Sequence, residues 1–183
     1  MQCPFNPFPQ IITRRLRLRE INDGDEYGYF ESRSDAEAAK ILCRDIYTSL
    51  EDGIQRVKYL KQDVEDEKSI SWVLSPINSD DFLGSVCLWN FSREQNKAEL
   101  GYELLQQYRG QGYMREAVAA VLDFGFNKMR LSRIDAYPPK NNPKSINLLE
   151  AVGFNRIGDL SEEGANGSIM HMWVYIYNKT ENE

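Results

Sequence analysis

A short loop with two glycines, set between a strand-like and a helix-like stretch, constrains this chain more than any other feature. Gly110 and Gly112 follow the alternating apolar pattern of residues 98–105 and precede the amphipathic pattern of residues 113–129. Glycine lets a backbone pass close to a ligand, and a helix N-terminus carries about half a positive charge. The chain must therefore run from a strand into a helix through a turn that can hold an anion, and we expect that anion to be phosphate.

The composition limits the class of protein. A length of 183 residues allows one domain with a sizeable core, so we expect a single domain over residues 1–183 with a frayed tail from residue 179. The net charge of −6 argues against direct nucleic-acid binding and against binding to an anionic membrane. A membrane span needs about 20 apolar residues, which no stretch approaches, and the Pro-rich start lacks the layout of a signal peptide.

The three cysteines are an odd number, widely spaced and without a CxxC pair. They indicate neither a disulfide framework nor a zinc site, so we expect a cytoplasmic protein. The sequence leaves the oligomeric state open, and a homodimer is one arrangement that it allows.

The periodicity of the chain predicts about six or seven strands and about four helices. A capping box at Ser49 and Asp52 predicts a helix over residues 49–66, and turn chemistry at residues 76–81 predicts a hairpin between the flanking apolar runs. Residues 25–44 have a helical but broken pattern. Further strands are predicted at residues 12–20, 97–105, 133–137, 154–157 and 170–177, with a short helix near 142–153. This order predicts an α+β fold with a mostly antiparallel sheet.

The motif Gln107-x-x-Gly110-x-Gly112 resembles the Q/R-x-x-G-x-G/A loop of the GNAT superfamily of acetyl-CoA-dependent N-acetyltransferases. Four further motifs follow the order and spacing of that superfamily, and they resemble its branch of ribosomal-protein N-terminal alanine and serine acetyltransferases. They are Phe8-Pro9 with residues 13–19, Ala98-Glu99-Leu100-Gly101-Tyr102, Asn142-Pro143-Lys144-Ser145, and Leu148-Leu149-Glu150 with Gly153-Phe154. The resemblance covers residues 8–158.

The resemblance implies an α/β/α layering in which the sheet splays at the cofactor site. It also implies that backbone N–H groups of residues 109–114 bind the pyrophosphate of coenzyme A, with Arg109 and Arg115 adding charge, while the pantetheine lies along the preceding strand. The expected cofactor-binding residues are Leu104, Leu105, Gln107, Arg109, Gly110, Gln111, Gly112, Tyr113, Met114, Asn142 and Ser145. The alternative is a plain helix start whose glycines only allow tight packing.

Asn142 and Ser145 stand at the start of the predicted short helix. An Asn followed by Pro143 is ordinary helix initiation, and the resemblance implies that Asn142 also contacts the cofactor. In related enzymes a hydroxyl near the position of Ser145 is thought to protonate the leaving thiolate. Many members of the superfamily use a tyrosine four residues further on, but here that residue is Leu149. Ser145 is therefore the candidate acid, and the alternative is a purely capping role.

The amine must lose a proton, so a base is needed. Glu99 and Glu103 alternate onto one face of their strand, roughly 13 Å apart at about 3.3 Å per residue, which is too far for a coupled pair. Glu99 is the preferred base because it stands where the family often has an acidic residue, and Glu103 is the runner-up. A solvated strand face is the alternative for both. The lone His171 on a predicted strand is more consistent with a packed or exposed residue than with a catalytic one.

These motifs predict an enzyme that transfers an acetyl group from acetyl-CoA to a primary amine by direct attack in a ternary complex, without a metal. The amine could belong to a protein N-terminus or to a small molecule, and the negative net charge favours a cationic amine. We expect acceptor specificity to reside in residues 25–50 and 161–168. One alternative is a catalytically silent acyl-CoA-binding sensor. Another is a nucleotide-binding module, although the loop lacks the Gly-Lys-Ser/Thr ending of a P-loop.

Overall fold

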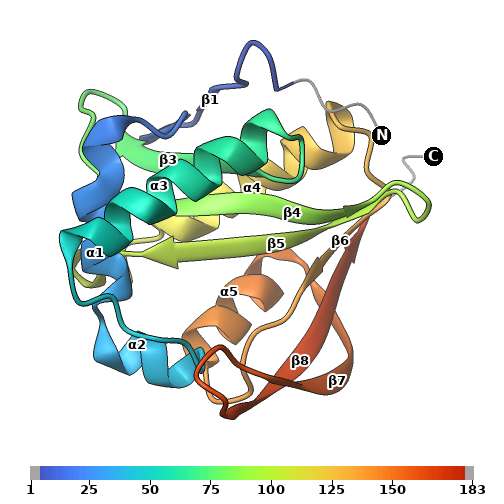
Figure 1. The fold of residues 1–183 in the computed structure, drawn as a ribbon. Coiled ribbons are helices and arrows are strands. Elements are labelled where there is room, and N and C mark those ends of the chain that lie inside the picture. The colour runs from blue at the N-terminus through green and yellow to red at the C-terminus, as the bar shows by residue number, and fades with distance from the viewer. Residues whose placement is uncertain (1–4, 180–183) are drawn as a thin grey trace.

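The computed structural model describes residues 5–179, which form one eight-stranded sheet with helices on both faces (Figure 1). The strands are β1 Ile11–Ile12, β2 Leu16–Arg19, β3 Ile70–Pro76, β4 Gly84–Ser92, β5 Lys97–Leu104, β6 Arg133–Ala136, β7 Asn155–Glu163 and β8 Ile169–Asn178. The α-helices are α1 Glu26–Arg33, α2 Ala36–Ile41, α3 Leu50–Glu65, α4 Tyr113–Asn127 and α5 Pro143–Val152, with short 3-10 turns η1 Asp23–Asp25 and η2 Gln106–Tyr108.

The sheet has the order β1-β2-β3-β4-β5-β6-β8-β7, and every neighbouring pair is antiparallel except β5 and β6. β5 pairs with β4 from Lys97 to Leu104, but it pairs with β6 only from Lys97 to Glu99. Beyond Glu99 the two parallel strands separate, and Figure 1 shows them diverging as a V. The sheet therefore has a splayed junction in its middle, directly before the glycine loop.

The predicted α+β class and the mostly antiparallel sheet are confirmed, as are the hairpin of β3 with β4 and the capping box of Ser49 with Asp52. The counts differ slightly because two predicted segments are divided. The strand predicted at residues 12–20 is broken after β1, since the Leu16 N–H donates to the Thr13 hydroxyl and closes a turn. The broken helical pattern of residues 25–44 becomes α1 and α2, with Asp35 capping the second helix. These divisions account for an eighth strand and a fifth helix.

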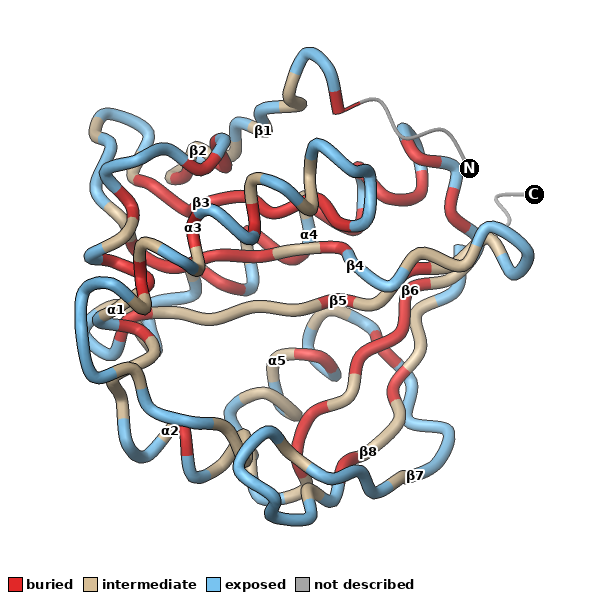
Figure 2. The backbone as a smooth tube through the Cα atoms, in the orientation of Figure 1, coloured by how far each residue is buried: buried red, intermediate tan, exposed pale blue. Residues whose placement is uncertain are grey.

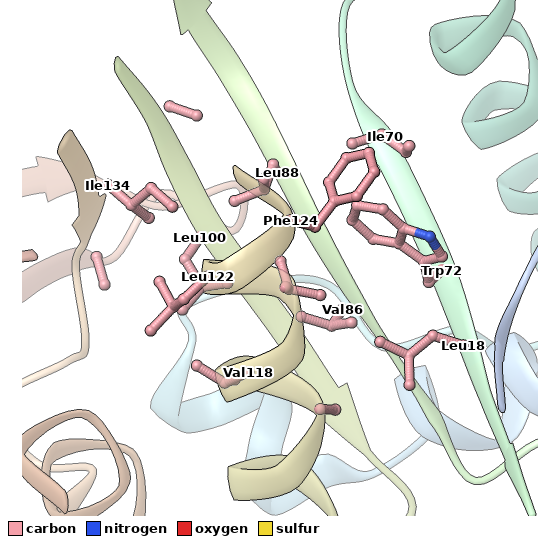
Figure 3. Close-up of a cluster of buried hydrophobic side chains, with 14 of the residues drawn as sticks. Leu18, Ile70, Trp72, Val86, Leu88, Leu100, Val118, Leu122, Phe124 and Ile134 are labelled. Atoms are coloured by element: carbon pink, nitrogen blue, oxygen red, sulfur yellow. The ribbon is translucent and has the colours of Figure 1, made fainter. Parts of the chain in front are cut away.

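Two apolar clusters hold helices on the two faces of the sheet. On one face α4 inserts its apolar side against β3, β4 and β5, and Figure 3 shows Phe124 of α4 beside Trp72 of β3. On the other face α1 and α3 cover a smaller cluster that includes Tyr29. Full burial of each such aliphatic side chain stabilises the fold by about 1.5–3 kcal/mol. Figure 2 shows the buried residues concentrated along β3, β4 and α4, whereas the edge strand β7 is almost wholly exposed.

None of the helices within residues 5–179 is long and apolar enough to cross a membrane.

Candidate active site

The glycine loop has the geometry of an anion cradle. Gly110 and Gly112 both have φ of +77°, a left-handed conformation that favours glycine, and Gly112 is the N-cap of α4. Within residues 5–179, the backbone N–H groups of residues 110–114 make no hydrogen bond to a protein acceptor. A Cβ on Gly110 would meet open space, so the loop faces outward. Unpaired N–H groups at a helix N-terminus fit a phosphate.

Arg15 brings a positive charge to this loop from the turn between β1 and β2. Its Nε lies 2.7 Å from Glu116 Oε2, its Nη1 donates to the carbonyl of Gln111 at 2.9 Å, and its guanidinium lies 4.5 Å from the centre of the Tyr113 ring. Its Nη2 lies 3.4 Å from the place that a Cβ of Gly112 would take. The sequence showed residues 13–19 only as part of a motif in a predicted strand, so this position of Arg15 was missed.

The two arginines predicted at the rim are bound to the protein itself. Arg109 donates its Nε to the carbonyl of Leu104 at 3.0 Å, and its Nη2 lies 2.9 Å from Asp35. Arg115 donates to the carbonyl of Ala151 at 3.3 Å. Both side chains therefore brace the loop against neighbouring elements. The other predicted loop contacts, Gln107, Gly110, Gln111, Gly112, Tyr113 and Met114, all lie in η2, the loop and the first turn of α4.

The backbone of β5 offers hydrogen-bonding groups to the splayed junction. The N–H of Leu105 donates to the carbonyl of Leu83 at 2.9 Å, on the side of β4. Because backbone groups alternate along a strand, those of Leu104 and Tyr102 face the opposite side, from which β6 has separated. The prediction named Leu104 and Leu105 together. In the structure Leu104 faces the junction, whereas the N–H of Leu105 is engaged within the sheet.

Ser145 lies against a tyrosine that the sequence did not single out. The Asn142 side chain accepts a hydrogen bond from the Ser145 N–H at 3.2 Å, so Asn142 is an N-cap, and Pro143 starts α5. The Ser145 hydroxyl lies 2.7 Å from the Tyr102 hydroxyl, which reaches it from β5. Burial raises the pKa of Tyr102 to about 12. Tyr102 appeared in the sequence only as part of the strand motif, and its spatial partner could not be read from there.

The two candidate bases have different surroundings. Glu99 accepts a hydrogen bond from Asn90 at 2.6 Å, and burial raises the pKa of its carboxyl. Burial acts in the same direction on Glu103, but nearby arginines, Arg33 first among them, hold the pKa of the Glu103 carboxyl below its usual range. Glu99 is thus the stronger base of the two. Within the described chain, no hydrogen bond links Glu99 to Glu103.

The remaining polar side chains have structural surroundings. His171 is exposed on β8, and its Nδ1 lies 2.7 Å from the Ser161 hydroxyl. Burial raises the pKa of Cys87 to about 11, so its thiol is a poor nucleophile at neutral pH. The ring centre of Trp173 lies 4.2 Å from Lys140 Nζ and 4.4 Å from Arg156 Cζ. No group of three or more metal-ligating side chains gathers among residues 5–179.

The site combines a parallel strand pair that splays with a glycine turn whose N–H groups are free at a helix start, as the resemblance to the GNAT superfamily implies. Comparison with known proteins gives the family. The Acetyltransferase (GNAT) domain matches residues 15–155. The chain belongs to this family, and it is an acetyl-CoA-dependent acetyltransferase.

Individual relatives are similar at low identity. An uncharacterised N-acetyltransferase of Bacillus subtilis, YoaA, is 27% identical over 155 residues, which cover 85% of this chain and 88% of the relative. The structure of a ribosomal-protein-S5-alanine acetyltransferase from Vibrio fischeri has a TM-score of 0.81 at 22% identity, covering 96% of this chain and 99% of the other. That of a spermidine N-acetyltransferase from Vibrio cholerae, in complex with CoA and spermine, has a TM-score of 0.79 at 21% identity, covering 92% and 98%. These structures share the fold, and their named acceptors differ.

Proposed function

We propose that the protein transfers an acetyl group from acetyl-CoA to a primary amine by direct attack in a ternary complex. The observation that carries this proposal is the continuity of the splayed edge of β5, which joins the glycine cradle at one end to the Tyr102–Ser145 hydroxyl pair beside it. Direct transfer is favoured because Cys87, a partly buried thiol on the neighbouring strand β4, has a raised pKa and is unsuited to a covalent relay.

The donor half of the site fits acetyl-CoA. The free N–H groups of residues 110–114, with Arg15 beside them, would bind the pyrophosphate. The Leu104 N–H and the backbone groups of Tyr102 would pair with the amides of the pantetheine, while the Leu104 carbonyl is held by Arg109. Asn142, as the N-cap of α5, would stand beside the cofactor.

The chemical step uses three side chains. The amine nitrogen attacks the thioester carbonyl, the new C–N bond forms and the C–S bond breaks. The ammonium proton passes to Glu99, directly or through water, and the raised pKa of Glu99 makes it a stronger base than an ordinary glutamate. The leaving thiolate takes a proton from the Ser145 hydroxyl. The Tyr102 hydroxyl then gives a proton back to Ser145. Burial raises the pKa of Tyr102 to about 12, so the phenol is protonated at neutral pH and can return a proton to the Ser145 oxygen; the phenolate that remains then takes a proton from solvent.

Binding of acetyl-CoA tests the donor half. Gly112→Glu places a side chain and a negative charge beside the cradle, and we expect it to abolish the heat of binding in isothermal titration. Gly167→Glu is a matched control because Gly167 also has φ of +77° but lies in the β7–β8 turn. Unchanged binding in Gly112→Glu would refute the proposed donor site.

Turnover tests the transfer. Release of coenzyme A should depend on the presence of a primary amine, measured over a panel of small amines and peptides that begin with Ala or Ser. Binding of acetyl-CoA without turnover of any acceptor would contradict the proposal and favour a sensor.

A further inference from the structure

Three arginines surround Glu103 on the face of β5 opposite to Tyr102. We call Arg33 of α1, Arg44 of the α2–α3 loop and Arg56 of α3 the basic cluster. Alternation along β5 puts Glu99 and Glu103 on this face, and a hydrogen bond from Ser85 to Glu103 places the neighbouring part of β4 there as well.

The ion pairs of this cluster are incomplete. Arg33 Nε and Arg44 Nη1 both lie 3.4 Å from the same oxygen, Glu103 Oε2. By contrast, the buried pair of Arg19 and Asp25 has two hydrogen bonds of 2.8 and 2.7 Å to separate oxygens. A fork of two short bonds is the strong form of an arginine–carboxylate pair. Glu103 therefore neutralises neither of its two arginines fully.

Positive charge is in excess here. Arg33 and Arg44 contact Glu103, and Arg56 is close enough for its charge to act on the same carboxyl. The Nε atom of each arginine is buried, with no hydrogen-bond partner within residues 5–179. The side chains of Arg33 and Arg44 are 22% and 14% exposed, so the cluster is shielded but still reaches solvent. Burying uncompensated charge is costly, and an added anion would offset that cost.

The cluster lies beside the splayed segment of β5. Arg44 follows Cys43, whose carbonyl accepts a hydrogen bond from the Asn166 N–H of the β7–β8 turn at 3.4 Å. The loop after α2 and the β7–β8 turn thus meet across the two arms of the splayed sheet. Glu103 directly follows Tyr102, so the cluster and the Tyr102–Ser145 pair flank the same splayed segment of β5 from opposite faces.

We propose that the basic cluster binds a carboxylate or phosphate group carried by the amine acceptor itself. This inference rests on the proposed function and narrows its acceptor to an amine with an anionic group on the same molecule. A polyamine would place a second positive charge against the arginines and would be disfavoured. The overall charge of −6 suggested a cationic amine, but charges close to the acceptor act more strongly than the distant ones that set the net charge.

A matched series of acceptors tests the inference. We would compare ω-amino carboxylates of increasing chain length, from β-alanine upward, with n-alkylamines and α,ω-diamines of the same lengths, and include aminoalkyl phosphates. At the best length we expect kcat/KM for the anionic amine to exceed that of the alkylamine by about tenfold or more, with the diamine lowest. Alkylamines or diamines that equal the anionic amines would overturn the inference. Two peptides that differ only in having Glu or Gln as the second residue are compared in the same way. A higher kcat/KM for the Glu peptide would show that a peptide side chain can supply the anion.

Two variants change the preference in opposite directions. Arg44→Gln should reduce the advantage of the anionic amine about tenfold, whereas Arg93→Gln, a surface arginine whose side chain is 75% exposed, should preserve it. Glu103→Gln removes the internal anion that competes for the arginines, so it should lower KM for the anionic amine. If the cluster is purely structural, both Arg44→Gln and Glu103→Gln should raise KM. The ratio of kcat/KM between the anionic amine and the alkylamine would then stay unchanged. If Arg44→Gln does not fold, the wild-type series decides the question.

Titration of the same amines into protein saturated with coenzyme A separates this inference from the proposed function. Tighter binding of the amino carboxylate than of the alkylamine supports the basic cluster, and equal or weaker binding refutes it, whether or not acetyl transfer occurs. If the amino carboxylate binds more tightly than the alkylamine but no acetyl transfer occurs, only the proposed function is refuted.

Discussion

Tyr102 and Ser145 bring two hydroxyl groups, from a strand and a helix, to a distance of 2.7 Å. The position at which many members of the superfamily have a tyrosine is Leu149, which is fully buried in α5. We propose that the phenol of Tyr102 supplies, from β5, the hydroxyl that α5 lacks at Leu149. A phenol that keeps its proton at neutral pH is suited to recharging a serine that has given its proton away.

We expect Ser145→Ala to lower kcat by about 100-fold, since general acid–base groups contribute on that scale, while the Kd of acetyl-CoA stays within about twofold. Tyr102→Phe should have a similar effect. If the two act in series, the double variant is no slower than Ser145→Ala alone. Steady-state kinetics with titration of acetyl-CoA measures both quantities, and fully multiplied losses would show that the hydroxyls act independently.

Glu99 predicts a dependence of kcat/KM on pH. The base acts when it is ionised, so activity should rise with pH through the pKa of Glu99, which burial places above the ordinary value of about 4.3. Glu99→Gln should remove this rise, the acidic limb of the pH profile, and should lower kcat/KM. Asn90→Ala removes a hydrogen bond that lowers the pKa of Glu99, so the limb should move to higher pH. A limb that stays in place in both variants would belong to another group, such as the amine itself.

At the scale of elements, the turn between β1 and β2 is joined to the start of α4. Glu116 of α4 accepts hydrogen bonds from the Thr13 hydroxyl at 2.7 Å and from the Arg15 backbone at 2.8 Å, in addition to the Arg15 side chain. This network holds the guanidinium of Arg15 beside the glycine loop. Two elements that are far apart in the chain thus form one side of the proposed donor site.

Arg15→Met should weaken acetyl-CoA binding by about tenfold, the scale of one charge-assisted hydrogen bond. Because the lost contact is ionic, the difference from the wild type should shrink at high salt. The neighbouring Arg14 is exposed, so Arg14→Met is the control and should bind normally. Titration at low and high ionic strength measures the effect, and equal affinities of the two variants would exclude a contact between Arg15 and the cofactor.

At the scale of the whole molecule, the two arms of the sheet meet at a short junction. β5 and β6 pair over only three residues, and Asp135 at this junction is 1% exposed. It accepts hydrogen bonds from Arg133 at 2.7 and 2.8 Å and from Lys97 at 3.2 Å. The Lys97 contact crosses from β5 to β6, whereas Arg133 and Asp135 both lie on β6, and Asp135 belongs to the last pair before the strands separate.

Asp135→Asn should lower the free energy of unfolding by about 2–3 kcal/mol, because it leaves two partly buried cations without their anion. Asp159→Asn removes an exposed partner of Lys140 and should change stability little. Urea denaturation of the two variants measures the difference. Similar small effects would mean that the junction is held by the β5–β6 backbone pairing rather than by the charges.

The fold was largely predictable because its signals are local. Helix starts at Ser49 and Asn142, the alternation of β5 and the left-handed glycines each depend on a few neighbouring residues. The misplaced boundary near Thr13 also has a local cause, a hydrogen bond between its hydroxyl and the chain that competes with an extended strand.

The site was predictable only in part, because its pairs are distant in the chain. The loop, Ser145 and Glu99 could be named from their motifs. The contacts of Tyr102 with Ser145, of Arg15 with Gln111 in the loop, and of Arg44 with Glu103 join residues between 43 and 96 positions apart, so no local motif reports them.

The amino-acid sequence by itself determined the family, the order of elements and the place of the anion cradle, since each follows from patterns within a few turns of chain. Only the tertiary structure decided which groups meet at the splayed strand: the hydroxyl pair on one face and the basic cluster on the other. The reason is that packing of separate elements sets these distances and burials, and burial and charge at close range set the chemistry of each side chain.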